Sequence, residues 1–259
     1  DDRQFNMFTQ RTGQVPAHLV DAGSIDRFGA IDPTIGGSSR RLSLIGNVQA
    51  DDWHVGGYVS DYRLNLFGNF TYFLENPTEG DQHEQVDRRT IFGGHAQRLF
   101  TVAENWAVRV GGDLRYDDIQ RLDLYQTTGR ERRVATRQDQ VAWASLGAFA
   151  ELEVRPIDDL RLTAGLRGVY YDFEVDSVIA ANAGSDDEIN FLPSLSAAYS
   201  VNDYVELYAN WGQGFHSNDV RGVTIAIDPA SGEAADSVDL FVKQEGAEIG
   251  VRVEGWRGL

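Results

Sequence analysis

Residues 105–117, Asn-Trp-Ala-Val-Arg-Val-Gly-Gly-Asp-Leu-Arg-Tyr-Asp, decide the fold class of this chain. From Trp106 to Tyr116 the even positions are apolar or glycine, whereas the odd positions are mostly polar or charged. A repeat of two places these sets on opposite faces of a β-strand. The stretch therefore predicts a strand with one apolar face and one charged face.

The same alternation recurs on both sides of this stretch. It is found over residues 41–49, 160–170 and 204–211, and no segment shows a convincing helical period. We therefore predict an all-β protein built from antiparallel strands.

The connections between these strands are of two kinds, and the two kinds alternate. Short acidic or Asn-rich turns are expected at 51–52, 103–105, 158–159 and 202–203. Long polar connections are expected at 10–39, 74–87, 118–138, 177–187 and 215–243. This order predicts an up-and-down meander of about ten strands, with short turns at one end and long loops at the other.

The strands are long enough to cross a lipid bilayer. No turn signal interrupts residues 53–73, and Trp106 lies ten residues before Tyr116 on the same face. At about 3.3 Å per residue and a tilt near 40°, ten residues rise roughly 25 Å, the height of the apolar band of an outer-membrane barrel. Aromatic girdles are then expected at the two membrane interfaces. The inner girdle comprises Trp53, Trp106 and Tyr204, and the outer girdle comprises Tyr116, Tyr170, Tyr171 and Trp211.

Composition excludes several other classes of protein. The 259 residues carry 40 Asp and Glu against 23 Lys and Arg, a net charge of -17, which disfavours binding to nucleic acid. Cysteine is absent, which excludes disulfides, thiolate metal sites and cysteine nucleophiles. No apolar run approaches the roughly 20 residues of a spanning helix. Neither end of the chain resembles a natural terminus, so we expect a segment of a larger protein.

No residue pattern predicts an enzyme, a cofactor or a firm metal site. His216, Ser217 and Asp219 are too close in sequence to form a nucleophilic triad. The carboxylates at 186–188 are expected to be solvated loop residues, with weak divalent-cation binding as the lesser alternative. The basic run Arg130, Arg132, Arg133 and Arg137 is expected in a loop, where it is either an ordinary charged surface or a contact for anionic lipid or ligand. Arg109, Asp113, Arg115, Arg161 and Arg167 are expected to face a barrel lumen, paired with one another or with a plug.

Four stretches resemble TonB-dependent receptors of the Gram-negative outer membrane. Residues 23–44 resemble an external loop with its following strand, and residues 62–89 resemble a strand, loop and strand of these barrels. The strand ending in Gly-Phe-His-Ser at 214–217 and the strand Glu-Gly-Ala-Glu-Ile-Gly-Val-Arg at 245–252 are similar to family features. The ligand-binding residues are not identified by this resemblance.

The resemblance implies that residues 1–259 form an internal part of a 22-stranded transmembrane barrel, with the plug domain lying outside this sequence. It implies an outer-membrane location, contact with outer-membrane lipid and, through the plug, the TonB energy-transducing complex. The implied function is active uptake of a scarce nutrient, such as a ferric siderophore. Two alternatives stay open: a passive porin-like channel, and a soluble all-β module that binds a ligand such as a carbohydrate.

Overall fold

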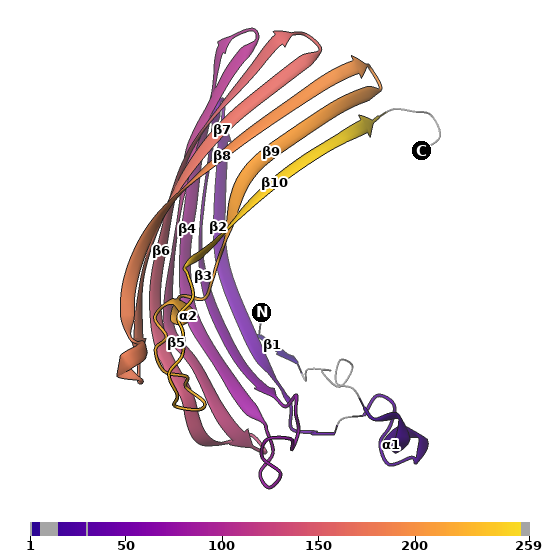
Figure 1. Cartoon of the computed structure of the whole chain (residues 1–259), viewed down its shortest axis with the longest axis vertical. Coiled ribbons are helices and arrows are strands. Elements are labelled where there is room, and N and C mark those ends of the chain that lie inside the picture. The colour runs from indigo at the N-terminus through magenta and orange to yellow at the C-terminus, as the bar shows by residue number, and fades with distance from the viewer. Residues whose placement is uncertain (1, 6–14, 30, 255–259) are drawn as a thin grey trace.

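The computed structural model describes residues 2–5, 15–29 and 31–254, and these form one curved antiparallel sheet with little else (Figure 1). Residues 1 and 255–259, at the chain ends that the sequence predicts to belong to a larger protein, lie outside the described residues. So do residues 10–14 and 30 of the predicted loop 10–39. In the described chain, no helix is both long enough and apolar enough to cross a membrane. The elements are β1 (Asp2–Phe5), α1 (Ala17–Asp21), β2 (Gly36–Ala50), β3 (Trp53–Gly68), β4 (His83–Ala103), β5 (Trp106–Thr128), β6 (Glu131–Ile157), β7 (Leu160–Ser177), the 3-10 helix η2 (Ala180–Asn182), β8 (Gly184–Asn202), β9 (Val205–Ser217), α2 (Val220–Val223) and β10 (Phe241–Val253).

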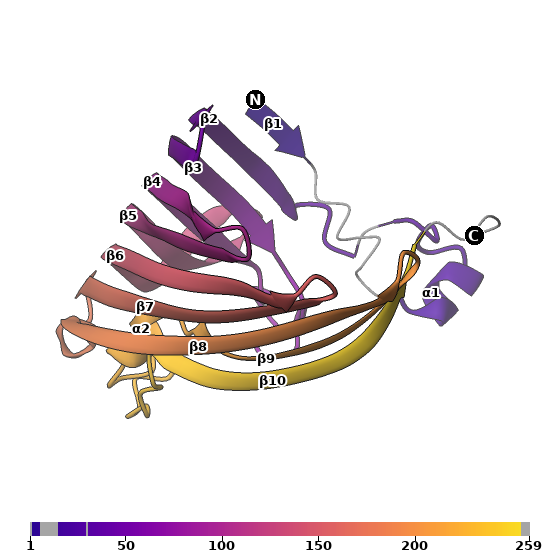
Figure 2. The same cartoon turned by 90° about the horizontal axis from the view of Figure 1, so that it is seen from above.

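Each strand pairs with its neighbours in the chain. The order across the sheet is β1 to β10 without a crossover. Viewed from above, the strands form an open arc (Figure 2). The predicted all-β meander of about ten strands is confirmed. β1 and β10 are the two edges of the sheet, since they are the first and last strands of that order.

The four short turns lie where the sequence predicts them, between β2 and β3, β4 and β5, β6 and β7, and β8 and β9. The predicted long connection at 118–138 is wrong. β5 continues to Thr128 and β6 begins at Glu131, so that Gly129 and Arg130, both with positive φ, make a tight turn. The polar composition here belongs to strands, because cross-strand partners such as Arg132 and Glu84, 2.9 Å apart, satisfy the charges.

The sheet has one apolar and one polar face, as the alternation predicts. The apolar face carries large side chains that protein does not cover, such as Leu44, 73% exposed, and Leu146, 58% exposed. On the polar face, glycines admit neighbouring side chains. A Cβ at Gly93 would lie 2.3 Å from the Tyr58 ring, and one at Gly147 would lie 2.3 Å from the Arg167 guanidinium. Side chains therefore converge on the polar face, which lies on the inner side of the curve.

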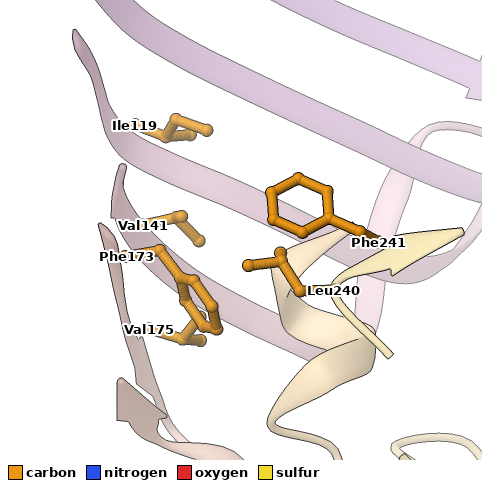
Figure 3. Packing of buried hydrophobic residues seen from close by; sticks show 6 residues of the cluster. All are labelled: Ile119, Val141, Phe173, Val175, Leu240 and Phe241. Carbon is orange, nitrogen blue, oxygen red and sulfur yellow. The ribbon is translucent and has the colours of Figure 1, made fainter. Parts of the chain in front are cut away.

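The hydrophobic core is small and lies at the long-loop end of the polar face. β8 pairs with β7 from Gly184 but with β9 only from Ser194 onward. The β9–β10 hairpin therefore leaves β8 and folds over β5, β6 and β7. Its residues Leu240 and Phe241 pack against the sheet, as Figure 3 shows. The sheet contributes Ile119, Val141, Phe173 and Val175 to this cluster.

Polar contacts hold the connection between β9 and β10, residues 218–240, on the sheet. The fully buried Asn182 accepts hydrogen bonds from the amides of Ala226 and Ile227, both at 2.9 Å. Its side-chain amide also donates to the Ile227 carbonyl at 2.8 Å. A single side chain thus satisfies three backbone groups of the covering loop.

Replacing Asn182 with Ala should release this loop, because three backbone groups lose their partners. We expect the free energy of loop opening to fall by about 2–3 kcal/mol. Amide hydrogen exchange at Ala226 and Ile227 should then become roughly thirty- to a hundred-and-fiftyfold faster. Asn202→Ala is the matched control, since the Asn202 side chain bonds the Tyr204 amide at the other end of the sheet. Unchanged exchange at Ala226 and Ile227 in Asn182→Ala would contradict the assignment.

Candidate ligand-binding site

A pocket of about 270 Å³ lies between the polar face of the sheet and the covering loop. We call it the polar-face pocket. β4 to β7 supply its floor, whereas the loop after β9 and the start of α2 supply its roof. It is lined by Arg89, Ile119, Leu122, Val141, Trp143, Tyr171, Ser217, Asn218, Asp219, Val220 and Leu240.

Two stacked aromatic rings form part of the floor. Trp143 on β6 and Tyr171 on β7 have ring centroids 5.6 Å apart and planes only 6° from parallel. Tyr171 also meets the edges of Phe215 and Phe241, whose centroids lie at 6.0 and 4.9 Å. These contacts fix the orientation of the Tyr171 ring beside the pocket.

Ion pairs extend the floor beside the aromatic rings. The Arg115 guanidinium lies 4.9 Å from the Trp143 ring centroid, and its Nε donates to Asp117 at 2.6 Å. Asp117 is 0% exposed and also lies 3.8 Å from Arg89 Nη1. Two arginines therefore neutralise this buried carboxylate, which would otherwise be costly to bury.

The roof is held by a second set of charges. Asp219 caps α2 by accepting from the Arg221 amide at 3.0 Å, and it pairs with the Arg221 guanidinium at 2.6 Å. Burial by itself would raise the pKa of Asp219, but the hydrogen bonds and charge of Arg221 outweigh it and lower the pKa below the ordinary value. Asp219 therefore stays ionised at neutral pH. Arg221 also lies 3.5 Å from the buried Asp139 of β6, which ties the roof to the sheet.

The pocket combines two aromatic rings with one arginine, Arg89, whose charge is balanced by Asp87 and Asp117. Aromatic or planar conjugated groups stack favourably on such rings. Ser217 and Asn218 add polar side chains to the lining, and the Asn218 amide donates to the Asp239 carbonyl at 2.7 Å. In the part of the chain that the structure describes, no group of three or more His, Asp or Glu side chains is arranged to hold a metal ion.

Below the pocket, cross-strand ion pairs cover the polar face. Asp113 pairs with Arg167 at 2.7 Å, Arg109 pairs with Glu151 at 2.7 Å, and Arg161 lies 3.8 Å from Glu206. The predicted pairing of these charges with one another is confirmed for Asp113 and Arg167. Arg109, Arg115 and Arg161 pair instead with other carboxylates of the same face. The pairs are about one-third to one-half exposed, so each adds little to stability.

The structure places most, but not all, of the residues assigned to the aromatic girdles on the apolar face. Trp53, Trp106, Tyr116, Tyr170 and Trp211 lie on the apolar face, and Tyr204 lies in the turn between β8 and β9. Their girdle role stays a prediction. Tyr171 does not belong to this set: it faces the polar-face pocket, because adjacent residues of a strand point to opposite faces.

The other charged groups singled out in the sequence are held by nearby protein groups. Arg130 donates to the carbonyl oxygens of Thr34 and Ile35, at 2.6 and 3.2 Å. Arg133 pairs with Glu79, and Arg137 pairs with Asp139. Residues 186–188 belong to β8 and not to a loop, so their side chains alternate between faces.

Sequence reasoning missed Trp143 and Arg89 as pocket residues. Trp143 lies within the apolar run 141–150, in which both alternating sets are largely apolar and hide the polar face. Trp143 shares an odd position with Val141 and Ser145, and this was the available signal that its side chain lies on the polar face. Arg89 ends the stretch 62–89 that resembles family barrels, and that resemblance implies no role for it.

Comparison with known proteins identifies a family. A model described as "TonB dependent receptor-like, beta-barrel" matches residues 1–242. None of the curated proteins compared matches the sequence. Among solved structures, the chain is similar to the ferric yersiniabactin uptake receptor FyuA from Yersinia pestis, with a TM-score of 0.61 and 16% identity over 88% of this chain and 36% of that one.

Two further structures show the same fold. The ferric citrate transporter FecA gives a TM-score of 0.60 and 17% identity over 78% of this chain and 31% of that one. The copper transporter OprC gives a TM-score of 0.57 and 15% identity over 85% and 37%. This chain thus spans roughly a third of the length of these structures. From the match over residues 1–242, we conclude that the chain belongs to the TonB-dependent receptor-like β-barrel family, whose members are transporters and not enzymes.

Proposed function

We propose that this chain forms part of the wall of an outer-membrane receptor that takes up a metal chelate, such as a ferric siderophore. The observation that carries the proposal is the pocket lined by Trp143, Tyr171 and Arg89 on the inner face of a sheet whose outer face is apolar. Receptors of similar fold include one for ferric yersiniabactin and a ferric citrate transporter. A chelate presents planar organic groups and oxygen atoms, which match stacked rings and hydrogen-bond donors.

The edges of the sheet support an internal position in a larger barrel. β1 and β10 end the described sheet, and each leaves one side of its backbone without a neighbouring strand. A bilayer does not tolerate such edges, because unpaired backbone groups find no hydrogen-bond partners in lipid. Further strands on both sides would satisfy them. Residues 1–259 are accordingly proposed as an internal section of the barrel.

The two faces define the proposed partners. The apolar face would contact outer-membrane lipid. The hydrated ion pairs of the polar face, such as Asp113 with Arg167, would face the lumen and a plug domain. Through that plug, the TonB complex would supply the energy for uptake.

The exposed apolar face also argues against a soluble carbohydrate-binding module. In such a module, apolar faces meet in a core. Here Leu114 and Leu166 stay more than half exposed, and no described segment covers them. A passive porin differs in having no plug, and energy-dependent uptake by the full-length protein would distinguish the two.

Replacing Trp143 or Tyr171 with Ala should weaken ligand binding, because each removes one ring of the stacked pair. We expect binding of the recognised chelate to weaken about tenfold per ring. The measurement is a binding titration of the full-length protein in bilayers with a panel of ferric catecholate, hydroxamate and citrate complexes. Trp106→Ala is the control, since Trp106 lies on the apolar face at the far end of β5. Equal affinities in all variants would refute the assigned pocket.

Adjacent residues of β7 test the assignment of faces. Leu166→Arg should destabilise the barrel by about 2–4 kcal/mol in a bilayer, because it places a charge in lipid near the midplane. Arg167→Leu should cost far less, since the partner Asp113 stays hydrated on the other face. The measurement is a denaturant titration of the full-length protein in lipid vesicles. Similar losses in both variants would show that the faces are misassigned.

A further inference from the structure

Two neighbouring strands, β8 and β9, separate partway along their length (Figure 1). β8 pairs with β9 over residues 194–202, but in the described sheet residues 184–193 have no partner on that side. The facing edge of β9 is also unpaired over 213–217, where β10 alone among the described strands pairs with β9. The sheet therefore contains a slot between two strand edges whose backbone groups lack a strand partner.

The residues at the point of separation favour a bend. Pro193 has no N–H group and cannot donate a hydrogen bond to a neighbouring strand, so pairing is weak there. Gly212 of β9 lies directly opposite Gly246 of β10, and Gly214 follows two residues later. A Cβ at Gly214 or Gly246 would meet no described atom within 4 Å, so close packing does not explain these two glycines. Glycines within strands also mark bends, and these lie where the hairpin leaves β8.

The hairpin turns its apolar face inward as it bends. β9 and β10 pair residue by residue, so Phe215 shares a face with Trp211, and Phe241 shares it with Ile249. This is the apolar, outward face of the sheet, on which Ile249 is 86% exposed. Phe215 and Phe241 nevertheless contact the Tyr171 ring on the inner face of β7, at centroid distances of 6.0 and 4.9 Å. A face suited to lipid therefore covers the inner side of the sheet.

The observed register of β8 and β9 would close the slot without a slip. Extended past its last pair, this register brings Phe191 opposite Phe215 and Ile189 opposite Ser217. Phe191 and Ile189 are 62% and 57% exposed on the apolar face. Phe215 would then form an aromatic cross-strand pair with Phe191, a favourable contact. The apolar band of β9 would also continue on the outward face.

Different interactions stabilise the two positions of the hairpin. In the folded position Leu240 and Phe241 pack against the sheet, and Asn182 bonds the covering loop. In the paired position both strand edges would gain backbone hydrogen bonds. These bonds matter most beside lipid, where an unpaired backbone group finds no partner. Each position thus satisfies groups that the other leaves unsatisfied, as expected of an element with two discrete arrangements.

We propose that the β9–β10 hairpin exchanges between these two positions and so opens and closes a slot in the barrel wall. In the folded position it roofs the polar-face pocket and leaves residues 184–193 without a neighbouring strand. In the paired position it completes the wall and uncovers the pocket, because residues 217–220 and Leu240 move with it. The inference goes beyond the proposed function, since both positions follow from register and alternation whichever ligand is recognised.

The test is disulfide trapping in the full-length protein in phosphatidylcholine vesicles, because residues 1–259 contain no cysteine. Ile189→Cys with Ser217→Cys should form a link, since these residues are opposite only in the paired position. In the folded position Ser217 lines the pocket on the inner face, whereas Ile189 is exposed on the outer face. Adding Asn182→Ala should raise the linking rate roughly tenfold or more, because hydrogen bonds that hold the folded position are lost.

Two further cysteine pairs serve as controls. Ala197→Cys with Ala209→Cys should link in both positions of the hairpin, since these residues are already opposite one another. Ile189→Cys with Gln213→Cys is four residues out of register and should not link in either position.

The outcomes separate this proposal from the proposed function, because none depends on ligand binding. A link between residues 189 and 217 that Asn182→Ala accelerates supports the exchange. No link there, while the pair at 197 and 209 links, shows that the hairpin stays folded and overturns the proposal. A link whose rate Asn182→Ala leaves unchanged shows a single paired position and overturns it as well. Failure of the pair at 197 and 209 would contradict the barrel wall itself, and both proposals with it.

Discussion

The lateral hydrogen-bonded register between strands is the constraint on which the rest of this structure depends. In a single-layer sheet, a slip of one residue would move every side chain of a strand to the opposite face. The register from β2 to β10 keeps the apolar residues of all nine strands together over the band where they would meet lipid. Near Ile119 the register of β5 shifts. Beyond that point the alternation is reversed, which brings Arg121 into line with Arg88 on the apolar face.

The same constraint explains why the hydrophobic core lies where it does. A sheet that exposes one apolar face and hydrates the other buries little apolar surface between its own elements. Burial occurs where the β9–β10 hairpin leaves β8 and covers Val141 and Phe173. The inward turn of this hairpin also places the loop that contains Asp219 over Tyr171 and Trp143. The pocket is thus a consequence of a hairpin that turns inward.

Several parts of this architecture could be predicted from the sequence. The repeat of two assigned the faces of residues 105–117, and acidic dipeptides marked the turns such as Asp158-Asp159. Two predictions failed for physical reasons. Residues 118–138 read as a loop because they are polar. Their charges are paired across strands, as Arg132 is with Glu84, or along one strand, as Arg121 is with Asp123, and such pairs are stable outside an apolar layer. Tyr171 was grouped with Tyr170 as a girdle residue, although the repeat of two already placed it on the other face.

The sequence by itself determined which residues lie on which face along 41–49, 105–117, 160–170 and 204–211, and the up-and-down order of the strands, because alternation and turn chemistry are local properties. Only the tertiary structure decided which residues meet across strands. The stacking of Trp143 on Tyr171 and the sharing of Asp117 by Arg89 and Arg115 depend on register and on the inward fold of a hairpin. Pairing register is set by the packing of whole strands, so it cannot be read from any one segment.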